Sequence, residues 1–208
     1  MTISYNHLAG KSVERLAALS DGIFGVVMTL LLLQLQEPAK DLIHSENQLL
    51  LALWALCPKL LVYLMSFITL GIFWVGQQTQ LNHLTRSERH LTWIHLIFLF
   101  AVTIVPFTTR LLASFITYRM ALLVYWANIM ILGITLSIAW WRAQSTGLVK
   151  EELTAEGRTA IRNRLIYAQI FYTFGALLCF VNNYWSFGFI ILLQLNYAFA
   201  PHFHRPKK

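Results

Sequence analysis

The stretch that decides the fold of this chain is Arg15-Leu-Ala-Ala-Leu-Ser20-Asp21-Gly22-Ile-Phe24-Gly-Val-Val-Met-Thr29-Leu-Leu-Leu-Leu33. It is apolar apart from an arginine and an aspartate near its start, and it is close to the roughly 20 residues that a helix needs to cross a bilayer. Because a charged side chain is costly in hydrocarbon, Arg15 and Asp21 mark a functional or assembly site by default. The function therefore depends on what Asp21 faces.

The composition of the 208 residues is typical of a multi-pass membrane protein. Hydrophobic residues make up 57% and charged residues only 12%, whereas a soluble domain has about 25% charged residues. The net charge of +7 does not indicate nucleic acid, because the basic residues lie between apolar blocks, where they determine topology. Cys57 and Cys179 lie in apolar runs without metal or redox spacing. We expect a lipid bilayer as partner, and neither a metal site, a cofactor nor nucleic acid.

Runs of about 20 apolar residues predict an all-α membrane protein with six transmembrane helices in one domain, residues 1–208. Pro58, inside the overlong second run, predicts a bend near one interface. The polar segment 144–163 is expected to be a short cytoplasmic helix or loop, so there is no room for a soluble catalytic domain. The six helices are placed at roughly 16–36, 50–76, 91–112, 120–141, 164–181 and 184–201.

The distribution of Lys and Arg between the loops predicts the orientation. With the N-terminus inside, twelve basic residues fall in the inner segments, and the outer segments hold three, Lys40, Arg110 and Arg119. This positive-inside asymmetry predicts a cell (inner) membrane protein with both termini in the cytoplasm.

Helical geometry predicts two different faces for the first helix. At 100° per residue, Asp21 lies about 140° from Val26 and falls outside the stripe to which Val26 belongs. Branched apolar residues on a membrane helix commonly face lipid or neighbouring helices, and a single threonine often bonds to its own backbone. Geometry alone therefore does not assign this stripe to a pore. Its members are Gly22, Val26, Thr29, Leu30 and Leu33.

Asp21 and Ser20 need hydrogen-bond partners from other helices. Arg15 is six positions from Asp21 and well off its face, so a direct salt bridge within the helix is not expected. A satisfied network would pack and orient the first helix, and the alternative is that Asp21 binds ions or protons directly. The candidate partners are Trp74, Gln77 and Gln78 in the second helix and His90, Trp93 and His95 in the third.

The same run resembles the signature first helix of the transmembrane protein 175 family of potassium channels. That signature is Arg, three residues, then Phe-Ser-Asp, usually followed by Gly and a Thr-Leu-Leu tail, and Leu19 replaces the Phe here. Leu91 to Leu111 is similar to the third helix of the family, with His95 at a position where Asn is expected. Trp74-Val-Gly-Gln77 is similar to the Trp-x-x-His end of the second helix.

The resemblance implies a potassium channel, modestly selective over sodium, that needs no cofactor and is not an enzyme. It implies a homotetramer whose first helices line the pore for monovalent cations, with hydrophobic constriction rings at Val26, Leu30 and Leu33 and a hydroxyl ring at Thr29. The sequence has no Thr-Val-Gly-Tyr-Gly selectivity loop, which agrees with this. The expected structural network consists of Arg15, Ser20, Asp21, Gly22, Trp74, Gln77 and His95.

Other classes of membrane protein remain as alternatives. A secondary transporter would have pseudo-symmetric halves with matching helix breaks, and none is evident. A membrane-embedded enzyme would need a nucleophile, metal or paired-carboxylate constellation, and none is present. A non-conducting assembly subunit also fits the sequence.

Overall fold

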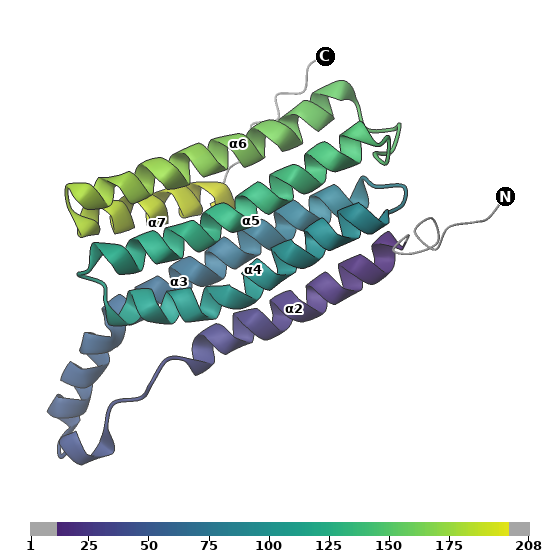
Figure 1. The fold of residues 1–208 in the computed structure, drawn as a ribbon. Coiled ribbons are helices and arrows are strands. Elements are labelled where there is room, and N and C mark those ends of the chain that lie inside the picture. The colour runs from purple at the N-terminus through teal and green to yellow at the C-terminus, as the bar shows by residue number, and fades with distance from the viewer. Residues whose placement is uncertain (1–11, 200–208) are drawn as a thin grey trace.

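The computed structural model describes residues 12–199, which form an all-helical bundle as predicted. The long helices pack side by side, and α2 lies at one edge of the bundle (Figure 1). Two short 3₁₀ helices, η1 (Lys40–Leu42) and η2 (Leu178–Phe180), lie in connections between them. The long helices are α2 (Val13–Leu33), α3 (Glu46–Asn82), α4 (Arg89–Ser114), α5 (Arg119–Ser145), α6 (Ala155–Leu177) and α7 (Asn183–Phe199).

Four of the helices in the described part of the chain, α2 to α5, are long and apolar enough to cross a membrane. Charged residues in the first half of α6, among them Arg158 and Arg164, lower its hydropathy. The last helix, α7, has an apolar part of only Trp185–Tyr197. The structure therefore contains six long helices, of which four are membrane spans by length and composition.

Hydrogen-bonding caps set where several helices begin. The side chain of Ser12 accepts a hydrogen bond from the backbone N–H of Arg15 (3.2 Å), so α2 begins at Val13 rather than at residue 16. Thr154 likewise accepts from the N–H of Gly157 (3.1 Å), so α6 begins nine residues before the expected position 164. Hydropathy identifies only the apolar part of a helix. The first backbone N–H groups of a helix have no partner within it, and a capping side chain that bonds to one of them can extend the helix beyond its apolar part. The second half of the polar segment 144–163, expected to be a short helix or a loop, is therefore the first part of the long helix α6.

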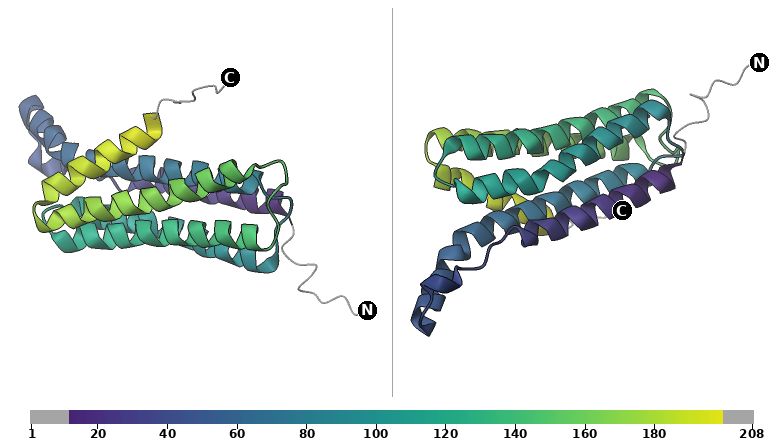
Figure 2. Two further views of the ribbon diagram at one scale, coloured as in Figure 1. Left: turned by 90° about the horizontal axis from the view of Figure 1, so that it is seen from above. Right: turned by 60° about the horizontal axis from the view of Figure 1, so that its bottom comes forward.

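The 37-residue helix α3 contains Pro58 and bends in this region. Its N-terminal part leaves the line of the rest of the helix and projects beyond the bundle (Figures 1 and 2). Proline removes one hydrogen bond and clashes with the preceding turn, which is the usual cause of such a kink. The side chains of the projecting part, including Leu51 and Trp54, are exposed in the single chain.

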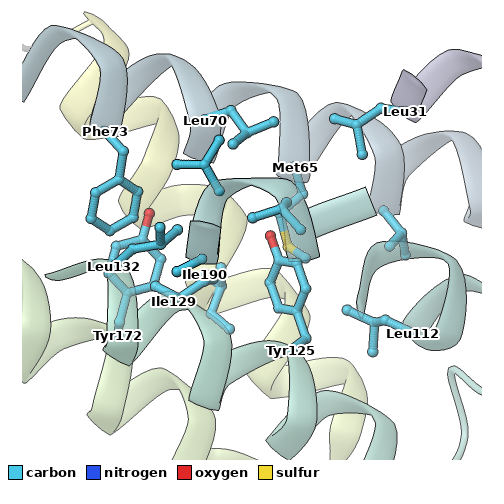
Figure 3. Packing of buried hydrophobic residues seen from close by; sticks show 14 of the residues in the cluster. Leu31, Met65, Leu70, Phe73, Leu112, Tyr125, Ile129, Leu132, Tyr172 and Ile190 are labelled. Atoms are coloured by element: carbon cyan, nitrogen blue, oxygen red, sulfur yellow. The ribbon is translucent and has the colours of Figure 1, made fainter. Parts of the chain in front are cut away.

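The core lies between α3, α4 and α5. The central helix α4 packs most extensively on α5 and also contacts α2 and α3. Figure 3 shows side chains of α3 and α5 that meet in this core. The buried side chains there include Met65, Leu70, Phe73, Tyr125, Ile129 and Leu132.

Two loops at one end of the bundle are joined by backbone hydrogen bonds. The N–H of Thr85 donates to the carbonyl of Leu148 (2.9 Å), and the N–H of Lys150 donates to the carbonyl of His83 (2.9 Å). An ion pair between Arg142 Nε and a Glu88 carboxylate oxygen (2.7 Å) ties α5 to the start of α4. These contacts hold the end of the bundle at which α2 begins and α3 ends.

The helices α6 and α7 approach closely at Gly175. A Cβ built on this glycine would lie 2.9 Å from side-chain atoms of both Ile190 and Phe189. The hydroxyl of Ser186 donates to the carbonyl of Gly175 (2.5 Å). Small residues at such crossings are how membrane helices pack against each other.

We expect Gly175→Leu to destabilise the bundle, because the added side chain would push α7 away from α6. Overpacking of this kind typically costs about 1–3 kcal/mol, so the melting temperature in detergent should fall. Gly188→Leu is the matched control, because a Cβ at Gly188 meets nothing within 4 Å. Equal melting temperatures for both variants would show that the crossing has room to spare.

Candidate functional site

The helix α2 buries one narrow face against the rest of the chain. Its buried residues recur at helical spacing, which is the pattern of a helix packed along one stripe. The ring of Phe24 lies 6.1 Å, between centroids, from that of Phe98 in α4. This packing fixes the rotation of α2, so that the side of the helix opposite these residues points away from the bundle. The buried residues are Leu16, Ser20, Phe24, Val27 and Leu31.

The stripe predicted around Val26 lies on the outward side of α2. In the single chain Val26 is 59% exposed, Leu30 41% and Leu33 77%. Thr29 is also exposed, and its hydroxyl donates to the carbonyl of Val26 (2.7 Å). These four residues therefore form an apolar surface, with one hydroxyl oxygen, that nothing in the described chain covers.

Asp21 is held by two donors from α3. The indole Nε1 of Trp74 donates to Asp21 Oδ1 (2.8 Å), and the amide Nε2 of Gln78 donates to the same oxygen (2.6 Å). Trp74 and Gln78 are four residues apart and therefore lie on the same face of α3. Bonds in which an ionised carboxylate accepts are about twice as strong as neutral ones. The carboxylate thus ties α2 to α3.

Ser20 begins a buried chain of hydrogen bonds across three helices. Its hydroxyl donates to Oε1 of Gln77 in α3, and the Gln77 amide nitrogen lies 3.3 Å from Nδ1 of His95 in α4. Ser20 and Gln77 are 0% exposed and His95 is 1% exposed. Since an amide nitrogen only donates, Nδ1 accepts, and the ring proton of a neutral His95 is on Nε2. This chain of bonds links α2 to α4 through α3, in a group of three helices that all pack on one another.

The structure does not bring every candidate into this network. The side chain of Arg15 is exposed and makes no hydrogen bond or ion pair within residues 12–199, so it is not paired with Asp21. Gly22 is exposed, with nothing within 4 Å of an added Cβ. His90 and Trp93 are exposed, and the hydrogen-bond partners of Asp21 and Ser20 within residues 12–199 do not include them.

A second buried polar cluster was missed by sequence reasoning. Thr69 Oγ1 accepts from Nε2 of Gln194 in α7 (2.6 Å), and Ser66 accepts from Thr109 of α4 (2.8 Å). The hydroxyl of Tyr125 in α5 lies within 3.3 Å of both Ser66 and Thr69. The signal was available, because Ser66 and Thr69 share a face of α3 with Gln77. This cluster joins α3, α4, α5 and α7.

Apart from the Asp21 carboxylate, the polar groups of the site are neutral dipoles. No group of three or more His, Cys, Asp or Glu residues that could hold a metal ion occurs in the described part of the chain. The charged group in the network, Asp21, is occupied by two donors. The outward stripe carries no charge. Such an arrangement suits positioning a helix and presenting an uncharged surface.

The sequence of this chain matches a family of known proteins. The model of the family described as endosomal/lysosomal potassium channel TMEM175 matches residues 15–106. The chain is 30% identical over 190 residues to a potassium channel of Streptomyces collinus, covering 89% of this chain and 91% of that one. It is 26% identical over 190 residues to a potassium channel of Chamaesiphon minutus, covering 88% and 92%.

The fold agrees with a solved structure. The crystal structure of a lysosomal potassium-selective channel TMEM175 homolog from Chamaesiphon minutus matches with a TM-score of 0.79 and 25% identity, covering 89% of this chain and 96% of that one. The matches in sequence and in fold extend over nearly the whole of these relatives. The chain therefore belongs to the TMEM175 family, which is a family of ion channels and not of enzymes.

Proposed function

We propose that this chain forms a potassium channel whose pore is lined by α2 from four copies. The observation that carries the proposal is the division of α2 into a face packed on its own bundle and an apolar stripe left uncovered. Relatives that match along most of their length are named potassium channels. Four copies of an edge helix around an axis would cover the stripe and enclose a pore.

The proposed pore closes by excluding water. Val26, Leu30 and Leu33 would form successive apolar rings, and on a helix that rises 1.5 Å per residue these rings span about 10 Å along the axis. A narrow apolar constriction can gate by dewetting. The conducting state then requires α2 to move outward or to rotate.

Thr29 would supply the polar layer within this constriction. Its hydroxyl proton is used in the bond to the Val26 carbonyl, so the oxygen keeps lone pairs that can face a cation. Four such neutral oxygens would offset part of the dehydration of an ion without trapping it. Preference for K⁺ over Na⁺ would then be modest and would follow the lower dehydration cost of K⁺.

The polar network would act as a brace beside the pore. Asp21 lies about 140° around the helix from Val26 and is bonded to Trp74 and Gln78. Ser20, on the buried face, is bonded to Gln77. Both attachments resist rotation of α2, so they set which side chains face the axis. By the positive-inside rule we propose that α2 begins on the cytoplasmic side of the cell membrane.

Flux through liposomes tests the channel directly. Vesicles containing the purified protein and loaded with K⁺ should release it down its gradient, faster than they release Na⁺. Valinomycin, a K⁺ carrier, is added afterwards, and the K⁺ that it releases measures the fraction of vesicles that hold no protein. Absence of flux while valinomycin still releases K⁺, or flux that needs a counter-substrate as a carrier does, would reject the proposal.

Widening the constriction should raise the current. We expect Val26→Ala and Leu30→Ala to increase single-channel conductance or open probability several-fold, because smaller rings favour the hydrated state of a pore. Leu32→Ala removes the same kind of side chain from an exposed position off the stripe and serves as control. If the control matches both variants, the pore lining lies elsewhere.

Removing a donor to Asp21 should weaken the assembly. We expect Trp74→Phe to reduce the tetrameric fraction in size-exclusion chromatography with light scattering, because a hydrogen bond to a charged group contributes about 1.5–3 kcal/mol. Asp21→Asn should have a smaller effect alone and should be non-additive with Trp74→Phe. The exposed Trp93, changed to Phe, is the control. A normal tetramer with altered cation preference would instead place Asp21 in the ion path.

A further inference from the structure

A partly enclosed cleft lies between α3, α5 and α6 on the side of the bundle away from α2. Its volume is about 220 Å³. Next to this cleft α7 runs obliquely across α6, so that the C-terminal end of its described part lies away from α6 (Figure 2). The last helix therefore leaves part of the α3–α6 boundary open. The apolar lining includes Ile72, Phe73, Leu136, Leu165, Ala168 and Tyr172.

One end of this cleft carries a cation. Arg164 of α6 lines it, together with Thr79 and Gln80 from the last turn of α3. The guanidinium of Arg164 lies 5.9 Å from the centroid of the Tyr197 ring, which also lines the cleft. Arg164 forms no ion pair with a carboxylate of the described residues, so none of these carboxylates lies within 4 Å of its guanidinium.

Buried acceptors in the cleft also lack donors. The side-chain oxygens of Gln80 and Gln169 are buried and receive no hydrogen bond from the described residues. Gln80 is 2% exposed, and its amide nitrogen already donates to the carbonyl of Leu136 (3.2 Å). An unmet buried acceptor costs free energy, so a group that can donate is favoured at this end.

We propose that the cleft binds an anionic phospholipid, with its phosphate at Arg164 and an acyl chain along the apolar lining. A guanidinium matches a phosphate with two parallel hydrogen bonds, and in an anionic phospholipid no choline or ammonium group neutralises that phosphate. Hydroxyls of a glycerol headgroup can donate at this end once the Gln80 amide turns toward the cleft, because its oxygen is covered in the free chain. With the orientation proposed above, this end faces the cytoplasm, and the lipid comes from the inner leaflet.

The segment that follows α7 is a less suitable occupant. Residues 200–208 carry Arg205, Lys207 and Lys208 and no acidic residue. Their insertion would bring like charges to Arg164 and leave it without a counter-ion, whereas a phosphate removes its charge. Charge complementarity therefore favours the lipid.

Native mass spectrometry of the purified full chain measures this binding without any ion flux. Titration with phosphatidylglycerol should give one tightly held lipid per chain, with about tenfold higher affinity than phosphatidylcholine of the same chain length, since both lipids carry the phosphate but the choline ammonium of the latter neutralises it and is repelled by Arg164. Arg164→Gln should lower the affinity for phosphatidylglycerol to that for phosphatidylcholine, and Arg164→Lys should retain part of the preference. Arg162→Gln removes an equal charge from an exposed position of α6 outside the cleft and should change neither affinity.

Filling the cleft tests the acyl-chain contact separately. Gly76 lines the cleft, and a Cβ there makes an ordinary contact of 3.5 Å with Leu136, so Gly76→Leu should fold and lower the affinity for both lipids. Gly71→Leu adds the same side chain to α3 outside the cleft and is the control. The melting temperature of each variant checks that it is folded.

Several outcomes would overturn the proposal. These are equal retention of the two lipids by the wild-type chain, unchanged phosphatidylglycerol affinity in Arg164→Gln, or loss of affinity only in the control variants. A several-fold rise in lipid affinity after deletion of residues 200–208 would show that this segment occupies the cleft instead. Because binding is measured in the absence of conduction, a failed flux experiment with intact lipid binding would reject the channel proposal alone.

Discussion

The attachment of α2 to α3 and α4 is the constraint on which the rest of this molecule depends. Lipid chains are as apolar as leucine, so apolar side chains alone provide little force that holds two helices together in a membrane. The hydrogen bonds from Trp74 and Gln78 to Asp21, with the Ser20–Gln77 bond and the Phe24–Phe98 contact, are specific and fix the rotation of α2. The charge of Asp21, which is costly in a membrane helix, thereby positions α2 against α3.

The fixed rotation of α2 about its own axis allows the helix both to pack on its own bundle and to leave one stripe uncovered. The buried face must bind the bundle tightly enough to define a direction, while the opposite stripe must remain without a partner inside its own chain. Polar groups on the first face and uncharged groups on the second satisfy both requirements. The second cluster, around Ser66, Thr69 and Tyr125, serves the same purpose deeper in the bundle, where it holds α3 against α4, α5 and α7. If α2 moves when the proposed pore opens, α3, α4, α5 and α7 would stay fixed relative to one another.

The two sides of the bundle differ in what they leave open. On the α2 side the uncovered surface is apolar and nearly without hydrogen-bonding groups, which suits contact with further copies of the chain and a pore that excludes water. On the α6 side the oblique α7 borders a cleft lined by an arginine that has no ion pair with the described residues, which suits an amphipathic anion.

The sequence by itself determined the all-helical class, the presence of six long helices and the position of Asp21 outside the Val26 stripe of α2, because hydropathy and the 3.6-residue period act locally. The starts of α2 and α6 departed from expectation because their caps, Ser12 and Thr154, lie outside the apolar runs. Only the tertiary structure decided that Trp74 and Gln78 hold Asp21 while His90 and Trp93 do not, and that Arg164 borders a cleft. Those pairings depend on the rotation and the axial offset of each helix against its neighbours. These are set by packing across the whole bundle and leave no signal in any single segment.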